Sequence, residues 1–213
     1  MSDIAKIRTQ ILRPNDYIFS KGELTINQDI LPLHPNQRLL YETILQLSPS
    51  SVIELGCGSG DHLKNLNTLN PDIQLYGREI SNEQIKLLKK RHPNLDAKIE
   101  QIDITLPYPF NTPNVDIAFT HAVIMHFHTG KSHLVALSNL FRYAKKQVIL
   151  MENWLRHSFM QDIEFLFLQH VLPWQKIYFY YRESKEFKRP HIMVIFSEVL
   201  KDYPELTDYS ILL

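Results

Sequence analysis

One short segment constrains the fold of this chain more than any other: the pentapeptide GCGSG at positions 56–60 holds three of the six glycines. Residues 51–55 before it are mostly apolar and predict a strand, and residues 61–69 after it have the apolar spacing of a helix. Glycines in such a turn permit positive φ and close approach of a ligand to the backbone. The following helix directs free N–H groups toward the same place. We therefore expect a ligand site here, at the carboxyl ends of the strands of an α/β sheet.

The sequence after this segment repeats the alternation of strand and helix. The segment S-N-E-Q that begins at Ser81 fits a capping box and marks the start of one helix. Strands alternating with helical patterns are typical of a parallel sheet that is covered by helices on both faces. The predicted strands are 51–55, 73–79, 97–103, 115–121 and 147–152, and the predicted helices are 35–47, 61–69, 82–91 and 131–143.

The last third of the chain has a different pattern. A Phe- and Leu-rich helix is predicted over 158–171, followed by apolar strands over 174–182 and 191–197. The connection between the two strands is too short for a crossover helix, so they form an antiparallel hairpin. We expect a single α/β domain over 1–213, in which 35–213 form a seven-stranded, mostly parallel sheet and 1–34 form a cap or lid.

Composition restricts the class of protein. The 213 residues suit one domain, and 23 basic residues balance 23 acidic ones, so a nucleic-acid partner is not expected. The single cysteine excludes an intramolecular disulfide and a Cys-rich zinc site. No apolar run reaches the length of a membrane span, and 1–19 lack the apolar core of a secretory signal. We expect a soluble, cytoplasmic protein.

The acidic residue before the glycines argues against a nicotinamide dinucleotide as the ligand. The dinucleotide pattern G-x-G-x-x-G would place its third glycine at position 61, which is Asp61. The carboxylate of Glu54 at the end of a strand would repel a pyrophosphate. A ligand with an ammonium or sulfonium group would instead offset the cost of burying that carboxylate.

Residues 52–60, VIELGCGSG, resemble motif I of the class I S-adenosylmethionine-dependent methyltransferases, in which an apolar strand precedes an acidic residue and x-G-x-G-x-G. The resemblance implies a Rossmann-like fold, S-adenosyl-L-methionine as the cofactor and S-adenosyl-L-homocysteine as the product. It implies that the cofactor contacts Glu54, Gly56, Cys57, Gly58, Ser59 and Gly60.

Three further segments match the same family. Glu79 ends the second strand, 23 residues after Gly56, where the family's acidic residue accepts hydrogen bonds from the ribose hydroxyls. Arg78 beside it could instead form an ion pair with Glu79. The segments 101–104 and 115–121 resemble those that contact the adenine and the methionine part of the cofactor. The resemblance therefore adds Glu79, Ile80, Asp103, Ile104, Thr120 and His121 to the cofactor site.

The loop after the fourth strand faces the methyl acceptor in this family. His126 lies in that loop and is our candidate for a general base, because histidine changes charge near neutral pH. The nearby histidines at 121, 126, 128 and 133 do not match a zinc-binding spacing, and we expect no metal site. The candidate acceptor-site residues are Tyr17 in the cap and Glu152 and Trp154 at the end of the fifth strand.

The expected function is methyl transfer to a small metabolite, or to a saccharide or phosphosugar building block, because the compact chain has no appended recognition domain. An RNA or protein methyltransferase and a non-catalytic, cofactor-binding adaptor remain as alternatives. Residues 120–123 read T-H-A-V, so the Asn/Asp-Pro-Pro-Tyr motif of amino-directed base methyltransferases is absent. The acceptor atom and the oligomeric state stay open.

Overall fold

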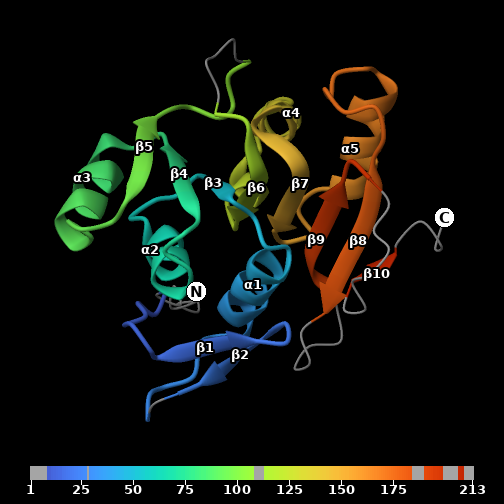
Figure 1. Ribbon diagram of the computed structural model, residues 1–213. Coiled ribbons are helices and arrows are strands. Elements are labelled where there is room, and N and C mark those ends of the chain that lie inside the picture. Colours follow the sequence, from blue (N-terminus) through green and yellow to red (C-terminus); the bar gives the residue numbers. More distant parts are fainter. Residues whose placement is uncertain (1–8, 28, 108–112, 184–189, 199–205, 209–213) are drawn as a thin grey trace, which may run out of the picture.

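A computed structural model describes residues 9–27, 29–107, 113–183, 190–198 and 206–208. Its main feature is an eight-stranded sheet with the order β10-β8-β9-β7-β6-β3-β4-β5 (Figure 1). Five neighbouring strands are parallel: β3 (Ser51–Leu55), β4 (Gln74–Glu79), β5 (Ala97–Gln101), β6 (Val115–His121) and β7 (Ala144–Met151). Two antiparallel strands follow, β9 (Pro190–Phe196) beside β7, and β8 (Tyr178–Glu183) beside β9. The predicted parallel core and C-terminal hairpin are confirmed.

The predicted count of seven strands is wrong by one. A two-residue strand, β10 (Thr207–Asp208), pairs with β8 and extends the sheet to eight. Two residues are too few to show the period-two alternation by which a strand is recognised in a sequence.

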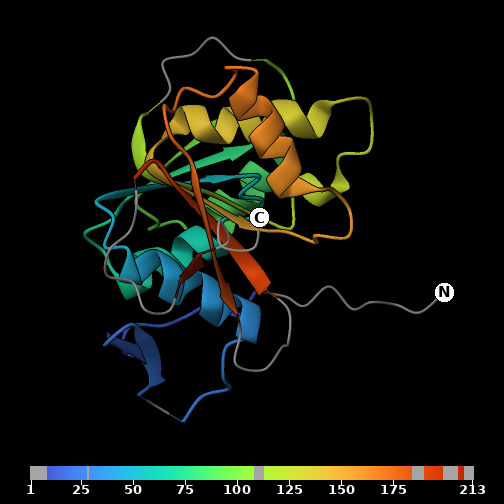
Figure 2. The ribbon, with the colours of Figure 1, turned by 90° about the vertical axis from the view of Figure 1, so that its right-hand side faces the viewer.

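Two helical layers cover the sheet, as Figure 2 shows from the side. One layer holds α1 (Pro35–Gln46), α2 (Asp61–Leu69) and α3 (Asn82–Arg91). The other holds α4 (Ser132–Tyr143) and α5 (Phe159–Leu168). Each layer has its own apolar core against one face of the sheet, as expected when a parallel sheet is buried on both faces. No helix in the described parts of the chain is long and apolar enough to span a membrane.

Several predicted element ends move for local reasons. The strand predicted to reach 103 stops at Gln101, and the side chain of Asp103 accepts a hydrogen bond from the amide of Thr105 instead. The last predicted helix ends at Leu168, just before His170 adopts a left-handed backbone at φ 55°. Trp174, predicted to begin a strand, donates its indole N–H to the carbonyl of Ala144.

The described N-terminal residues lie outside the sheet. They form a hairpin of β1 (Tyr17–Ser20) and β2 (Glu23–Ile26), which contacts α1 and α2. The amide of Leu24 donates to the carboxylate of Glu42 on α1, and that carboxylate also pairs with Arg182 on β8. Buried polar contacts thus connect the hairpin to the rest of the domain.

Candidate active site

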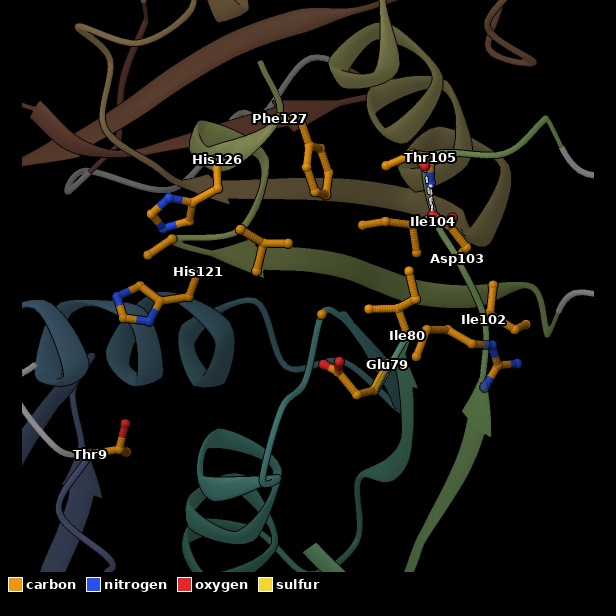
Figure 3. A pocket seen from close by; sticks show the side chains of 14 residues that line it. Thr9, Glu79, Ile80, Ile102, Asp103, Ile104, Thr105, His121, His126 and Phe127 are labelled. Atoms are coloured by element: carbon orange, nitrogen blue, oxygen red, sulfur yellow. Dashed lines mark hydrogen bonds between the residues drawn. The ribbon is translucent and has the colours of Figure 1, made fainter. Parts of the chain in front are cut away.

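A cavity of about 760 Å³ opens at the carboxyl ends of β3, β4 and β6, which is where an open α/β sheet binds ligands. Its volume lies within the usual range for small-molecule sites. Figure 3 shows Glu79, Ile80 and the segment 102–105 on one side and the histidines of the β6 end on the other. The lining residues are Thr9, Gly56, Arg78, Glu79, Ile80, Ile102, Asp103, Ile104, Thr105, His121, Ala122, Val123, His126 and Phe127.

The glycine loop needs its glycines for different reasons. Gly56, Gly58 and Gly60 all have left-handed backbones, with φ of 79°, 52° and 76°. A Cβ on Gly56 would lie 2.7 Å from the side chain of Val123, and one on Gly60 would lie 2.6 Å from Leu88. Apart from its two chain neighbours, no described residue has a heavy atom within 4 Å of the corresponding position on Gly58. Packing therefore excludes side chains at Gly56 and Gly60, whereas Gly58 leaves open space.

Glu79 connects this loop to the cavity. One carboxylate oxygen accepts from the amide of Gly58 at 2.8 Å, and the other accepts from the amide of Ser81 at 2.9 Å. The side chain lines the cavity, and each oxygen keeps a further lone pair for a ligand donor. The alternative that Arg78 pairs with Glu79 is wrong, because the guanidinium forms its ion pair with Glu100 at 3.0 Å.

Glu54 lies beneath the loop, 2% exposed, and does not line the cavity. Its Oε2 atom is buried and has no hydrogen-bond partner among the described residues. Burial raises the pKa of this carboxyl well above its usual range, and the nearby carboxylates of Asp61 and Glu79 raise it further. An orphaned buried oxygen of this kind suits a positively charged donor, and the ammonium group of S-adenosyl-L-methionine is one.

The cavity wall formed by Ile80 and residues 102–104 combines apolar and polar groups. Ile80 is 59% exposed and presents its apolar side chain to the cavity. Asp103 lines the cavity with Ile102 and Ile104, and one of its carboxylate oxygens is used by Thr105. Its second oxygen can accept from a ligand amino group.

The other end of the cavity is formed by the loop after β6. This loop contains a single 3-10 turn, η1 (Ile124–His126), and begins at Ala122, whose φ of 55° is strained for a residue with a side chain. His126 is exposed and lines the cavity. His121 lines it as well, and its Nδ1 lies 2.8 Å from Nε2 of His62.

Glu152 supports this loop from behind. Its carboxylate accepts from the amides of Val123, Ile124 and Met125 at 3.0 to 3.2 Å. The side chain is 7% exposed and lies outside the cavity lining, which corrects the expectation that it faces the acceptor. Burial raises the pKa of Glu152 above its usual value, although the three amides oppose this.

Other predicted site residues also lie outside the lining. The hydroxyl of Tyr17 accepts from the amide of Leu33 in the apolar core beneath α1 and α2, which corrects its expected place over the ligand. Trp154 packs edge-on against Phe159. The Cys57 thiol is buried in the core beneath the loop, and the Ser59 hydroxyl accepts from Arg91. Thr120, Gly58 and Gly60 are likewise not among the residues that line the cavity.

Several lining residues carry no site signal in the sequence. Val123 and Phe127 lie in the loop that was assigned to the acceptor, so only their orientation was missing. Thr9 gave no signal, because it precedes every recognisable element and reaches the cavity only through the fold. Within the described residues, no group of three His, Cys, Asp or Glu side chains is placed to hold a metal ion.

A family described as a methyltransferase domain matches residues 47–185, well over half of the chain. The chain belongs to this family. Its membership confirms the predicted family, enzyme class and Rossmann-like fold, and S-adenosyl-L-methionine is the cofactor of that class. No curated protein sequence matches the chain.

Solved structures with TM-scores above 0.5 support the fold of the methyltransferase domain. The methyltransferase domain of bacterial CtHen1-C is 16% identical and has a TM-score of 0.56, with 76% of this chain and 98% of that chain covered. The plantazolicin methyltransferase BpumL, in complex with SAH, is 15% identical with a TM-score of 0.54, covering 77% and 82%. CalS10, an amino pentose methyltransferase from Micromonospora echinaspora, is 17% identical with a TM-score of 0.48, covering 57% and 51%. This chain therefore spans about half the length of CalS10.

Proposed function

We propose that this chain transfers the methyl group of S-adenosyl-L-methionine to a small-molecule acceptor, such as a metabolite or a saccharide or phosphosugar building block. One observation carries the proposal: a single cavity extends from Glu79 and Asp103 to His121 and His126. A nucleoside held at the acidic end would direct the rest of the cofactor toward the histidine loop. A recess of about 760 Å³ lies within the usual range of small-molecule sites.

The residues at the acidic end of the cavity would bind the nucleoside, and Glu54 would act from beneath the glycine loop. Glu79 would accept from the ribose hydroxyls, Asp103 would accept from the adenine amino group, and Ile80 and Ile104 would cover the ring. Glu54 beneath the glycine loop would receive the ammonium group. These roles agree with the lone pairs that Glu79 and Asp103 keep for a ligand, and with the Glu54 oxygen that no described residue contacts by a hydrogen bond.

The cofactor supplies an activated methyl group when bound, so the protein's contribution is alignment, exclusion of water and proton removal. Alignment alone can contribute on the order of 7–11 kcal/mol to such a step. His126 is exposed to the cavity and is held by the turn that Glu152 caps, so we assign it as the general base. A base is required only where the acceptor loses a proton, as a hydroxyl or an ammonium group does.

Thermal unfolding with S-adenosylhomocysteine, S-adenosylmethionine or NADH tests the cofactor directly. A ligand at 100 times its dissociation constant stabilises the fold by roughly 2.7 kcal/mol. For a domain of this size the midpoint rises by about 5–10 °C. We expect this rise with the two sulfur nucleotides and none with NADH. A rise with NADH alone would contradict the proposal.

The His126→Ala variant tests the base. We expect turnover to fall by about 10²- to 10⁴-fold, the usual contribution of general base catalysis. Affinity for S-adenosylhomocysteine should stay within a few-fold, because His126 lies at the acceptor end. His128→Ala is the matched control, since it removes an exposed histidine two residues away that does not line the cavity. Unchanged turnover in His126→Ala would remove the base role.

A further inference from the structure

Four side chains form a hydrogen-bonded chain that leads from the core to the cavity. The Nδ2 atom of Asn65 lies 2.8 Å from the hydroxyl of Tyr41, and this hydroxyl lies 2.8 Å from Nδ1 of His62. The Nε2 atom of His62 lies 2.8 Å from Nδ1 of His121. Asn65 and Tyr41 are fully buried, His62 is 8% exposed, and His121 is the member that lines the cavity.

Two main-chain groups determine the direction of this chain. The Oδ1 atom of Asn65 accepts from the amide of Leu12 at 2.8 Å, and its Nδ2 atom donates to the carbonyl of Gln10 at 2.7 Å. The amide of Asn65 therefore has one possible orientation. Its second Nδ2 proton is directed at Tyr41, so the Tyr41 hydroxyl accepts there and has one proton left to donate.

That proton goes to His62. The opposite arrangement would put a proton on Nδ1 of His62 and leave the Tyr41 hydroxyl accepting twice, with its own proton buried and unpaired, which is costly. His62 therefore accepts at Nδ1 and carries its proton on Nε2, which donates to Nδ1 of His121. The remaining proton of His121 then lies on Nε2.

Both imidazoles are neutral in this arrangement. Burial lowers the pKa of His62 well below its usual value, and the neighbouring His121 lowers it further. Burial, together with the nearby His34, lowers the pKa of His121 to about 4. A neutral imidazole whose Nδ1 atom already accepts a hydrogen bond can only donate at Nε2. His121 is therefore not suited to remove a proton.

We propose that Asn65, Tyr41 and His62 are positioning residues that hold His121 as an Nε2–H donor, which binds an oxygen atom of the ligand in the cavity. The oxygen belongs either to the methionine carboxylate of the cofactor or to the methyl acceptor. This inference rests on the proposed function for the identity of the ligand. Figure 3 places His121 at the same end of the cavity as His126, away from Glu79. The two histidines thus have different roles: His121 donates a hydrogen bond to the ligand, and His126 removes the proton.

The tautomers can be measured without any substrate. In protein labelled with ¹⁵N-histidine, two-bond ¹⁵N–¹H correlation spectra should show His62 and His121 as neutral rings protonated on Nε2. Tyr41→Phe removes the donor to His62 and keeps the aromatic ring, so both rings should become mixtures of tautomers. Tyr143→Phe, which removes another buried tyrosine hydroxyl outside this chain, should leave them unchanged. Finding His121 protonated on Nδ1 in the wild-type protein would overturn the inference.

A second variant reverses the direction of the chain. Asn65→Asp replaces the donor that faces Tyr41 with an acceptor, so the Tyr41 hydroxyl should donate to the new carboxylate. His62 would then carry its proton on Nδ1, and His121 should change to the Nδ1–H tautomer. A folded Asn65→Asp protein in which His121 keeps its wild-type tautomer would contradict the mechanism.

The bound oxygen is identified with two variants of His121. His121→Leu removes the donor. It should weaken binding of the molecule that carries the oxygen, either the cofactor or the methyl acceptor, by about tenfold, the usual effect of one hydrogen bond. His121→Gln places an amide N–H near the same point and should stay within threefold of wild type. A loss of affinity for S-adenosylhomocysteine identifies the cofactor carboxylate, and a rise in the KM of the acceptor alone identifies the acceptor. No change in either would overturn the binding role.

The two proposals can fail separately. Absence of S-adenosylhomocysteine binding to the wild-type protein would refute the proposed function, whatever the tautomers are. A wrong tautomer in a protein that binds S-adenosylhomocysteine would refute the inference alone.

Discussion

Removal of the Glu79 side chain should separate binding from stability. In Glu79→Ala two main-chain amides, those of Gly58 and Ser81, lose their acceptor. Both residues are partly exposed, so water replaces the carboxylate in part, and we expect the free energy of unfolding to fall by about 1–2 kcal/mol. The melting temperature should fall by roughly 3–6 °C.

The effect on the cofactor should be larger. Two hydroxyl–carboxylate hydrogen bonds, each worth about 1.5–3 kcal/mol, would be lost from the ribose. Allowing for their non-additivity, about 3 kcal/mol remains, which is a decrease in affinity of roughly 100-fold. Isothermal titration calorimetry with S-adenosylhomocysteine measures the change in affinity. Urea unfolding of the ligand-free protein measures the change in the free energy of unfolding.

Glu83→Ala is the matched control for Glu79→Ala. Glu83 carries the same charge, lies four residues further along on α3 and is exposed outside the cavity. It should change the affinity by less than twofold. The reasoning is refuted if Glu79→Ala binds S-adenosylhomocysteine as tightly as Glu83→Ala does.

Replacing the carboxyl groups of Glu54 and Glu152 by amides should affect stability in different ways. The pKa of Glu54 is higher in the folded protein than in the unfolded chain, so its protonation stabilises the fold at low pH, and this contribution is lost as the pH rises. Glu54→Gln should therefore lose less stability between pH 5 and pH 8 than the ligand-free wild type. It should also bind S-adenosylhomocysteine more weakly. An equal change in urea midpoint between the two pH values in variant and wild type would contradict the first expectation. Glu152→Gln directs an amide group at main-chain N–H groups, and we expect a loss of about 1–3 kcal/mol in urea unfolding together with slower turnover. Wild-type stability in this variant would show that the carboxylate does not hold the loop.

Short-range patterns were sufficient for the core of the domain. The strand at 51–55, the helix at 61–69 and the strand at 115–121 have the predicted bounds. The N-cap at Ser81 was also predicted, and its hydroxyl accepts from the amide of Gln84 at 3.3 Å. Each of these features depends on residues a few positions apart, so its physical cause is contained in the segment itself.

The places of Tyr17 and Glu152 could not be predicted in this way. The sequence places Tyr17 in the N-terminal cap and Glu152 at the end of a strand, and both positions suggested contact with the ligand. In the structure the Tyr17 hydroxyl accepts from Leu33, and the Glu152 carboxylate accepts from the loop after β6. A side chain at a strand end can point into the cavity or behind the loop, and only the packing of the next segment decides which. The same uncertainty applies to Arg78, which reaches across to Glu100 on β5.

The sequence by itself determined the order of strands and helices, the glycine loop with its acidic neighbours, and the family to which they point. The tertiary structure alone decided which polar groups meet. Asn65, Tyr41, His62 and His121 come from two helices and a strand, and no spacing in the sequence connects them. Hydrogen-bond direction depends on donors and acceptors a few ångströms apart in space. The proton on His121 is therefore determined by the main chain of the N-terminal segment, more than 100 residues earlier.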